Sequence, residues 1–191
     1  MKQKIKFMAM MLMGILLGVT QLFAVEQTFF NETFGTPTGN TAVESFEGWS
    51  ETGVTHSGTA RVGVTESNRC GLSGSSGSGY LYASTADIKE LVISGINTSG
   101  YTDIKLSINY KAANTTAKFT IAYSTDGSSY TTIRSGECGT GSTSSYKTYT
   151  SNPSTNAIPA VDNLRIKITL NVATGTTYYG VFWDDLKLMG T

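Results

Sequence analysis

The chain has little of the side-chain chemistry on which most active sites depend. Its 191 residues include one histidine, His56, and two cysteines, Cys70 and Cys138. So few ligands, with no C-x-x-C spacing, argue against a zinc site. A Ser-His-Asp or Cys-His system would have to use His56, which stands in the glycine-flanked segment 53–58 and is predicted to be an exposed turn residue. The sequence therefore predicts a protein that is not an enzyme.

Charge is also scarce. Charged residues make up 15% of the chain, and 14 Lys and Arg balance 14 Asp and Glu. Proteins that bind nucleic acids usually present a basic face, and the sequence shows no basic stretch that would form one. Nucleic acid is therefore not an expected partner.

Long apolar runs are absent beyond the N-terminus, and the one run there is short. Three lysines (Lys2, Lys4 and Lys6) precede an uncharged apolar stretch at 7–19. A basic start, a short apolar stretch and then a small residue are typical of a cleaved signal peptide. A membrane-spanning anchor would need about 20 apolar residues, so no membrane insertion is expected once this segment is removed.

The cleavage site is predicted at Ala24, within a residue or two, because Leu22 is larger than the residue preferred before the cut. This divides the chain into a signal peptide at 1–24 and one domain at 25–191. No cysteine lies near the cut to carry a lipid, so we expect a secreted protein, extracellular or periplasmic, that is released without an anchor.

Strand patterns fill the mature chain. In the segment 103–111 apolar side chains occupy every second position, the period of a half-buried strand. Similar segments are predicted at 26–31, 60–64, 79–83, 90–94, 118–124, 130–134, 146–150, 164–172 and 178–188, with a hairpin turn at 125–128. No apolar run has helical spacing. Many strands with short connections predict an all-β fold of two packed antiparallel sheets.

Cys70 and Cys138 can form a disulfide in an oxidising compartment. The bond would close a loop of about 68 residues and stabilise the fold by about 4 kcal/mol in the chain-entropy account. The alternative is two free thiols, since both cysteines stand in glycine-rich loop sequence.

Aromatic residues are the clearest functional signal, with 10 Tyr, 8 Phe and 2 Trp. Aromatic rings on sandwich loops can stack on the apolar faces of sugars, although Tyr and Trp also fill sandwich cores with one polar edge left wet. The candidate ligand-binding residues are Tyr130, Tyr146 and Tyr149, the last two because serine and threonine surround them.

Three short motifs carry a resemblance to known domains. They are Asn-Glu-Thr-Phe-Gly at 31–35, Phe-Glu-Gly-Trp at 46–49, and Val-Phe-Trp-Asp-Asp-Leu-Lys-Leu at 181–188. Together they resemble the jelly-roll domains of secreted bacterial proteins, especially of Bacteroidetes. The similar families are the choice-of-anchor J and MAM-like domains and the galactose-binding-like carbohydrate-binding modules. The resemblance implies a jelly-roll β-sandwich.

The same resemblance implies a structural calcium ion between the first and last strands, with Glu32 and Asp184 as its side-chain ligands. Strand alternation would place Asp184 on the core face with Phe182 and Leu186, and leave Asp185 in water. A buried carboxylate needs a partner, which a hard cation with oxygen ligands would supply. The alternative is that Asp184 caps a backbone amide or meets an arginine or lysine. No Asp-x-Asp-x-Asp loop is present.

We therefore expect a secreted, non-catalytic module that binds glycan and holds a structural calcium. The first alternative is a protein–protein adhesion or cell-surface assembly domain, whose partner would be a surface protein. A weaker alternative is a small glycoside hydrolase, which needs two carboxylates flanking one bond. Asp184 and Asp185 do not meet that need, since adjacent strand residues point to opposite faces.

Overall fold

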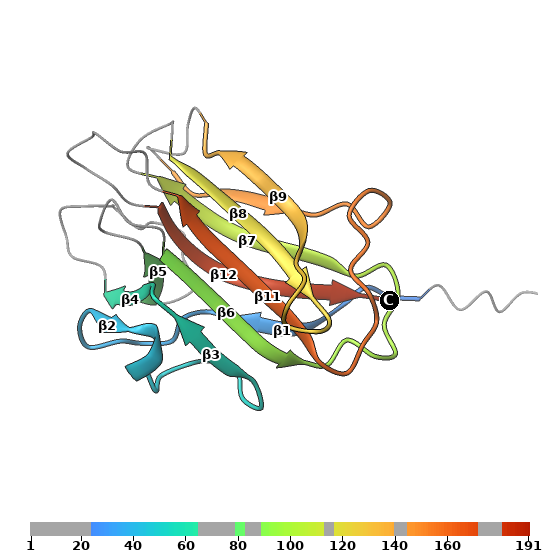
Figure 1. Cartoon of the computed structure of the whole chain (residues 1–191), viewed down its shortest axis with the longest axis horizontal. Helices are drawn as coiled ribbons and strands as arrows, with labels where there is room; N and C mark the ends of the chain where they lie inside the picture. The colour runs from blue at the N-terminus through green and yellow to red at the C-terminus, as the bar shows by residue number, and fades with distance from the viewer. Residues whose placement is uncertain (1–23, 65–78, 83–88, 113–116, 140–144, 172–180) are drawn as a thin grey trace, which may run out of the picture.

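Two antiparallel β-sheets lie face to face in the computed structural model (Figure 1). It describes residues 24–64, 79–82, 89–112, 117–139, 145–171 and 181–191. Nearly all of the predicted signal peptide lies outside these residues, so that assignment stays a prediction. Two sheets packed in this way form the β-sandwich expected from the strand pattern.

One sheet has seven strands, which follow the order β10-β7-β12-β5-β4-β2, with β1 also paired to β12. They are β1 (Gln27–Glu32), β2 (Thr41–Ala42), β4 (Arg61–Val64), β5 (Gly79–Tyr82), β7 (Lys105–Ala112), β10 (Lys147–Thr150) and β12 (Val181–Gly190). Strand β12 is central: β7 lies along one side, while β1 and β5 share the other.

The second sheet has five strands in the order β3-β6-β11-β8-β9. They are β3 (Thr55–Gly58), β6 (Lys89–Ile96), β8 (Lys118–Ser124), β9 (Thr131–Glu137) and β11 (Leu164–Asn171). The one helical element among the described residues is a 3-10 turn, η1 (Val43–Ser45), which packs against β3. No helix in this part of the chain is long and apolar enough to cross a membrane.

The sequence located most strands to within a few residues. The hairpin at 125–128 joins β8 to β9, and Gly127 adopts the positive φ of +81° that such a turn requires. Strands β2 and β3 were missed. Strand β2 has only two residues, β3 is short and mostly polar, and neither has an apolar alternation.

The core lies between the sheets and follows the predicted alternation. From β7 it takes Leu106, Ile108 and Tyr110, and from β11 it takes every second residue from Leu164 to Leu170. The opposite side chains of each strand face outward.

Strand β12 departs from the prediction at a β-bulge. Its pairing with β7 shifts between Asp184 and Lys187, and Asp185 has a φ of +51°. The extra residue reverses which side chains face inward, so that Trp183, and not Phe182, shares the core with Leu186 and Leu188. The predicted side of the strand was therefore wrong for Phe182 and Asp184, although both are buried, because a period of two does not hold across a bulge.

Candidate functional site

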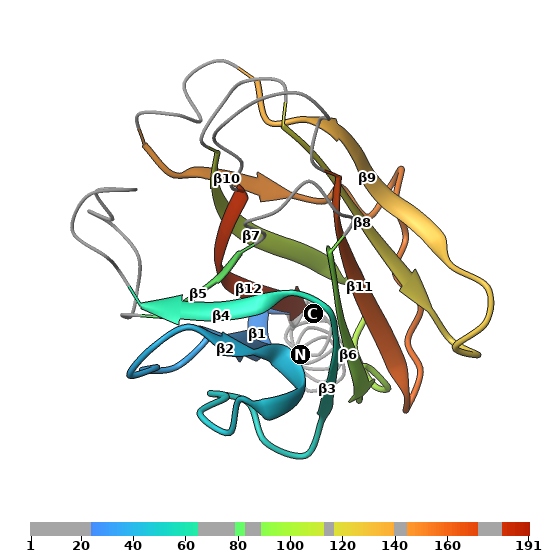
Figure 2. The ribbon, with the colours of Figure 1, turned by 60° about the vertical axis from the view of Figure 1, so that its left-hand side comes forward.

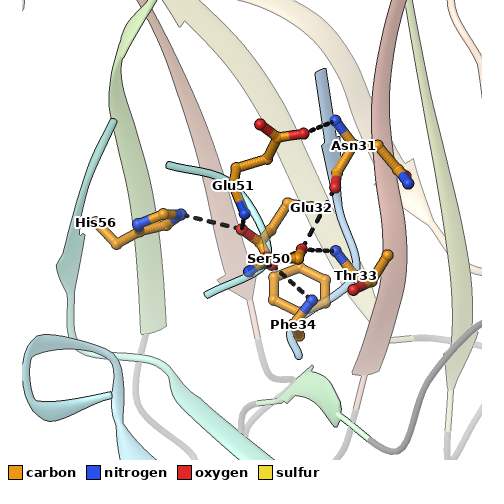
Figure 3. A network of polar contacts seen from close by, with 7 residues as sticks. All are labelled: Asn31, Glu32, Thr33, Phe34, Ser50, Glu51 and His56. Atoms are coloured by element: carbon orange, nitrogen blue, oxygen red, sulfur yellow. Dashed lines mark hydrogen bonds and ion pairs between the residues drawn. The ribbon is translucent and has the colours of Figure 1, made fainter. Parts of the chain in front are cut away.

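A buried carboxylate, Glu32, stands at the centre of a polar network between the two sheets (Figure 3). Its Oε1 accepts hydrogen bonds from the Phe34 N–H at 2.7 Å, from the Ser50 hydroxyl at 2.7 Å and from the Ser50 N–H at 3.2 Å. Its Oε2 accepts one from the Glu51 N–H at 3.2 Å and lies 3.5 Å from His56 Nε2. Both oxygens are therefore occupied by protein donors.

His56 is not the exposed turn residue that the sequence suggested. It lies in β3, and its side chain is only 4% exposed. Trp49 stacks on its ring with centroids 3.7 Å apart and planes at 1°. The sequence offered little sign of this burial, because His56 is surrounded by small, polar residues that resemble a turn.

Two of the motifs behind the family resemblance meet at this network. Gly35 has a φ of +56°, and a Cβ added to it would lie 1.8 Å from the carbonyl oxygen of Gly48. Phe46 covers Gly48, and its ring meets Trp49 edge-on with centroids 5.0 Å apart. Segments 31–35 and 46–49 therefore form one packing unit that carries Glu32, and their shared role is structural.

Electrostatics favour the ionised form of Glu32. Burial by itself would raise its pKa, but the contacts with His56, Ser50 and Glu51 outweigh that effect and hold the pKa below the ordinary value. Ser50 donates its hydroxyl hydrogen to Glu32 and accepts from the Thr33 N–H at 2.7 Å. The serine is thus held by the carboxylate, which is not the serine–histidine contact of a nucleophilic triad.

The donors around Glu32 do not fit a cation. N–H and O–H hydrogens surround its oxygens, whereas calcium needs six to eight oxygen ligands. Among the described residues, no three His, Cys, Asp or Glu side chains are grouped so as to hold a metal ion. Glu32 therefore obtains from the protein the partner that calcium was expected to provide, and the predicted calcium remains a prediction.

Asp184, the second predicted metal ligand, is fully buried beside the bulge in β12. Its Oδ1 accepts the Asp185 N–H at 2.8 Å, which is the backbone-capping alternative considered from the sequence. Asp185 is 6% exposed and accepts a hydrogen bond from the Asn109 amide at 3.0 Å. The expectation that Asp185 stays in water was wrong, because the bulge turns it toward β7.

A second group of polar and aromatic contacts joins the two sheets between β9 and β10. The Arg134 guanidinium lies 3.5 Å from the centroid of Phe119 and donates to the carbonyls of Phe119, Gly136 and Glu137. The Tyr149 hydroxyl donates to the Ile133 carbonyl at 3.1 Å. Burial raises the pKa of Tyr149, and the nearby Arg134 charge opposes that rise. Arg134 was not singled out from the sequence, where one arginine in a short strand gives no signal.

The three predicted ligand-binding tyrosines do not gather on one surface. Tyr149 is partly buried against the core. Tyr146 precedes β10 on the same edge and is also partly buried. Tyr130 lies in the β8–β9 hairpin, where Lys167 Nζ approaches within 4.1 Å of its ring centroid. Tyr130 is thus the candidate on an open sheet face.

That face is the outer side of the five-stranded sheet, here called the hydroxyl face. Side chains paired directly across neighbouring antiparallel strands point to the same side. One such row crosses all five strands and consists of Ser57, Val92, Lys167, Ala122 and Thr132. A second row contains Thr55, Ser94 and Arg165, and a third contains Glu90, Thr169, Thr120 and Ser135. Hydroxyl groups dominate the face.

Cys138 is buried, and burial raises the pKa of its thiol to about 11. It forms no disulfide with any described residue. Cys70, its predicted partner, lies outside the described residues, so the disulfide remains a prediction.

Comparisons with known proteins agree on the fold and give no sequence family. No protein-family profile matches the chain, and no curated protein matches it. Among solved structures, the K1 cleaved adhesin domain of Lys-gingipain from Porphyromonas gingivalis W83 matches with a TM-score of 0.52 and 9% identity, over 88% of this chain and 99% of that one. A likeness at this identity establishes the architecture alone.

Two carbohydrate-binding modules match with similar TM-scores. TmCBM61, solved with beta-1,4-galactotriose, has a TM-score of 0.50 and 14% identity over 73% of this chain and 90% of its own. The xylan-binding domain from CBM 22 has a TM-score of 0.50 and 15% identity over 85% of this chain and 94% of its own. The chain is therefore similar in fold to carbohydrate-binding modules and to adhesin domains.

Proposed function

We propose that this protein is a secreted, non-catalytic module that binds carbohydrate on the hydroxyl face. The observation that carries the proposal is the face itself: rows of serine and threonine beside Tyr130, on a sandwich similar to carbohydrate-binding modules. Serine and threonine hydroxyls both donate and accept hydrogen bonds, as the hydroxyls of a sugar require. Tyr130 offers a flat ring held in place by Lys167.

A protein partner fits this face less well. Stable protein interfaces have an apolar centre rich in aromatic residues. The rows described above contain only Val92 and Ala122 as apolar members, and Ala122 is buried. The proposal includes no calcium at Glu32, whose oxygens already accept hydrogen bonds from the protein.

Isothermal titration of the purified protein with a panel of neutral and acidic polysaccharides tests the proposal. We expect binding of modest affinity, because a shallow polar face buries little area. Tyr130→Ala should weaken it about fivefold to tenfold, corresponding to about 1 kcal/mol of ring contact. Tyr101→Ala is the control, since Tyr101 stacks on Phe29 away from this face. If no polysaccharide binds, the proposal is wrong.

A further inference from the structure

The hydroxyl face carries two positive charges that no described residue neutralises. Arg165 and Lys167 are outward-facing neighbours on the central strand β11. Neither makes an ion pair or hydrogen bond within the described part of the chain; Lys167 contacts only the Tyr130 ring, and Arg165 packs over the turn at Gly127. Two lysines elsewhere are paired: Lys105 with Glu26, and Lys118 with Glu137 at 3.6 Å.

From these two cations we infer that the ligand of this face is an anionic polysaccharide, one that bears carboxylate or sulfate groups. The inference rests on the proposed function and specifies its ligand class. Alternate residues of one strand lie about 7 Å apart on the same face. The two cations therefore form one positive centre with hydroxyl groups on both sides.

The chemistry of the two side chains suits oxyanions on a sugar. The arginine guanidinium presents a planar set of donors that matches carboxylate or sulfate oxygens, and the lysine ammonium is a compact charge. Lys167 Nζ lies over one face of the Tyr130 ring, so a sugar that packs against this pair would place its substituents near the ammonium. The three rows contain one acidic side chain, Glu90, whose carboxylate accepts a hydrogen bond from Thr169.

Binding to four polymers tests the inference: polygalacturonate, dextran sulfate, a neutral galactan and poly-L-glutamate. We expect one or both acidic polysaccharides to bind and the galactan to bind at least tenfold more weakly. Lys167→Gln and Arg165→Gln should each weaken binding by up to about fivefold, the range for exposed charge pairs. Affinity should fall when salt rises from about 0.05 to about 0.5 M, because mobile ions screen exposed charges.

Lys187→Gln is the matched control. Lys187 is an outward-facing lysine on the other sheet, paired with Ser107 of β7, and it makes no ion pair with the described residues. It should leave binding unchanged, and the thermal midpoint of every variant should confirm folding. Tighter binding of polygalacturonate would identify the recognised group as a carboxylate, and tighter binding of dextran sulfate would identify it as a sulfate.

The remaining outcomes separate the two proposals. If neutral galactan binds as tightly as the acidic polymers and Lys167→Gln has no effect, the anionic ligand is wrong while carbohydrate binding stands. If poly-L-glutamate binds as tightly as the acidic polysaccharides, the face is a general anion surface, and the inference is overturned. If no polysaccharide binds, both proposals fail.

Discussion

A charged side chain lies at each of two edges of the sandwich, an anion at one and a cation at the other. At the edge near β1 and β3, the buried anion Glu32 faces His56, on whose ring Trp49 stacks. At the edge near β9 and β10, the cation Arg134 lies over Phe119 and binds three carbonyls. Figure 2 shows the strands of the two edges, with β10 and β9 at the top and β2 and β3 at the bottom. Each charge stands beside an aromatic ring and is hydrogen-bonded mainly by backbone groups.

The difference lies in how far along the chain the partners are. Apart from the Phe34 N–H two residues further on, the partners of Glu32 lie 18 to 24 positions away, in a loop and in the opposite sheet, so its full network forms only when the sheets dock. Arg134 bonds carbonyls two, three and fifteen residues away, all within the β8–β9 hairpin. The hydrogen bonds of Glu32 should therefore depend on the docked sheets and those of Arg134 on one hairpin. The rings of Tyr110 and Tyr149, whose centroids lie 5.3 and 5.7 Å from the guanidinium, still bring β7 and β10 to the Arg134 edge.

Removing the buried anion should have the largest effect. Glu32→Ala leaves the donors of Phe34, Ser50 and Glu51 unsatisfied and removes the carboxylate oxygen beside His56 Nε2. We expect the free energy of unfolding to fall by about 3–5 kcal/mol, as for other broken buried ionic networks. Urea unfolding followed by tryptophan fluorescence measures it. The control is Glu47→Ala at an exposed position of the same loop, which should change stability by less than about 0.5 kcal/mol.

Removing Arg134 should have a smaller effect. Arg134→Ala loses a cation–π contact and three hydrogen bonds, but these bonds are only part-buried or exposed, so we expect the free energy of unfolding to fall by about 2 kcal/mol. Arg134→Lys keeps the charge and loses the planar donors, and should recover only part of the loss. Arg165→Gln, on the exposed face, is the control. A loss as large as that of Glu32→Ala would show that the two edges do not differ as proposed.

Acid should distinguish the edges, because the buried charge at the first is a carboxylate and the charge at the second is a guanidinium. The pKa of Glu32 is below its ordinary value of 4.5 in the folded protein. Its stabilisation is therefore complete above pH 4.5 and is lost as pH falls toward the folded pKa, at up to about 1.4 kcal/mol per pH unit. Unfolding free energies of the wild type and Glu32→Gln measured from pH 7 to about pH 3 should converge as pH falls. Parallel curves would contradict this assignment.

The sequence predicted the sandwich well because apolar alternation in β7, β8 and β11 reflects burial directly. It failed where one residue breaks the period. The bulge at Asp185 reverses the inward side of β12, and no local signal marks it. It also failed at the face on which the proposed function depends: Arg165 and Lys167 stand at the outward positions of a strand that was recognised only by its apolar side.

Calcium should have the smallest effect on stability, and adding or removing it tests whether Glu32 and Asp184 hold a metal ion. If Glu32 and Asp184 held calcium with a dissociation constant near 10 μM, about 1 mM free ion would add about 2.7 kcal/mol and raise the thermal midpoint by several degrees. Because hydrogen-bond donors already surround Glu32, we expect the midpoint to be the same in calcium and in chelator. A calcium-dependent rise that Asp184→Asn abolishes, and Glu47→Gln does not, would instead establish the metal. Asp184 would then be a calcium ligand, and the network of Glu32 and His56 would only support it.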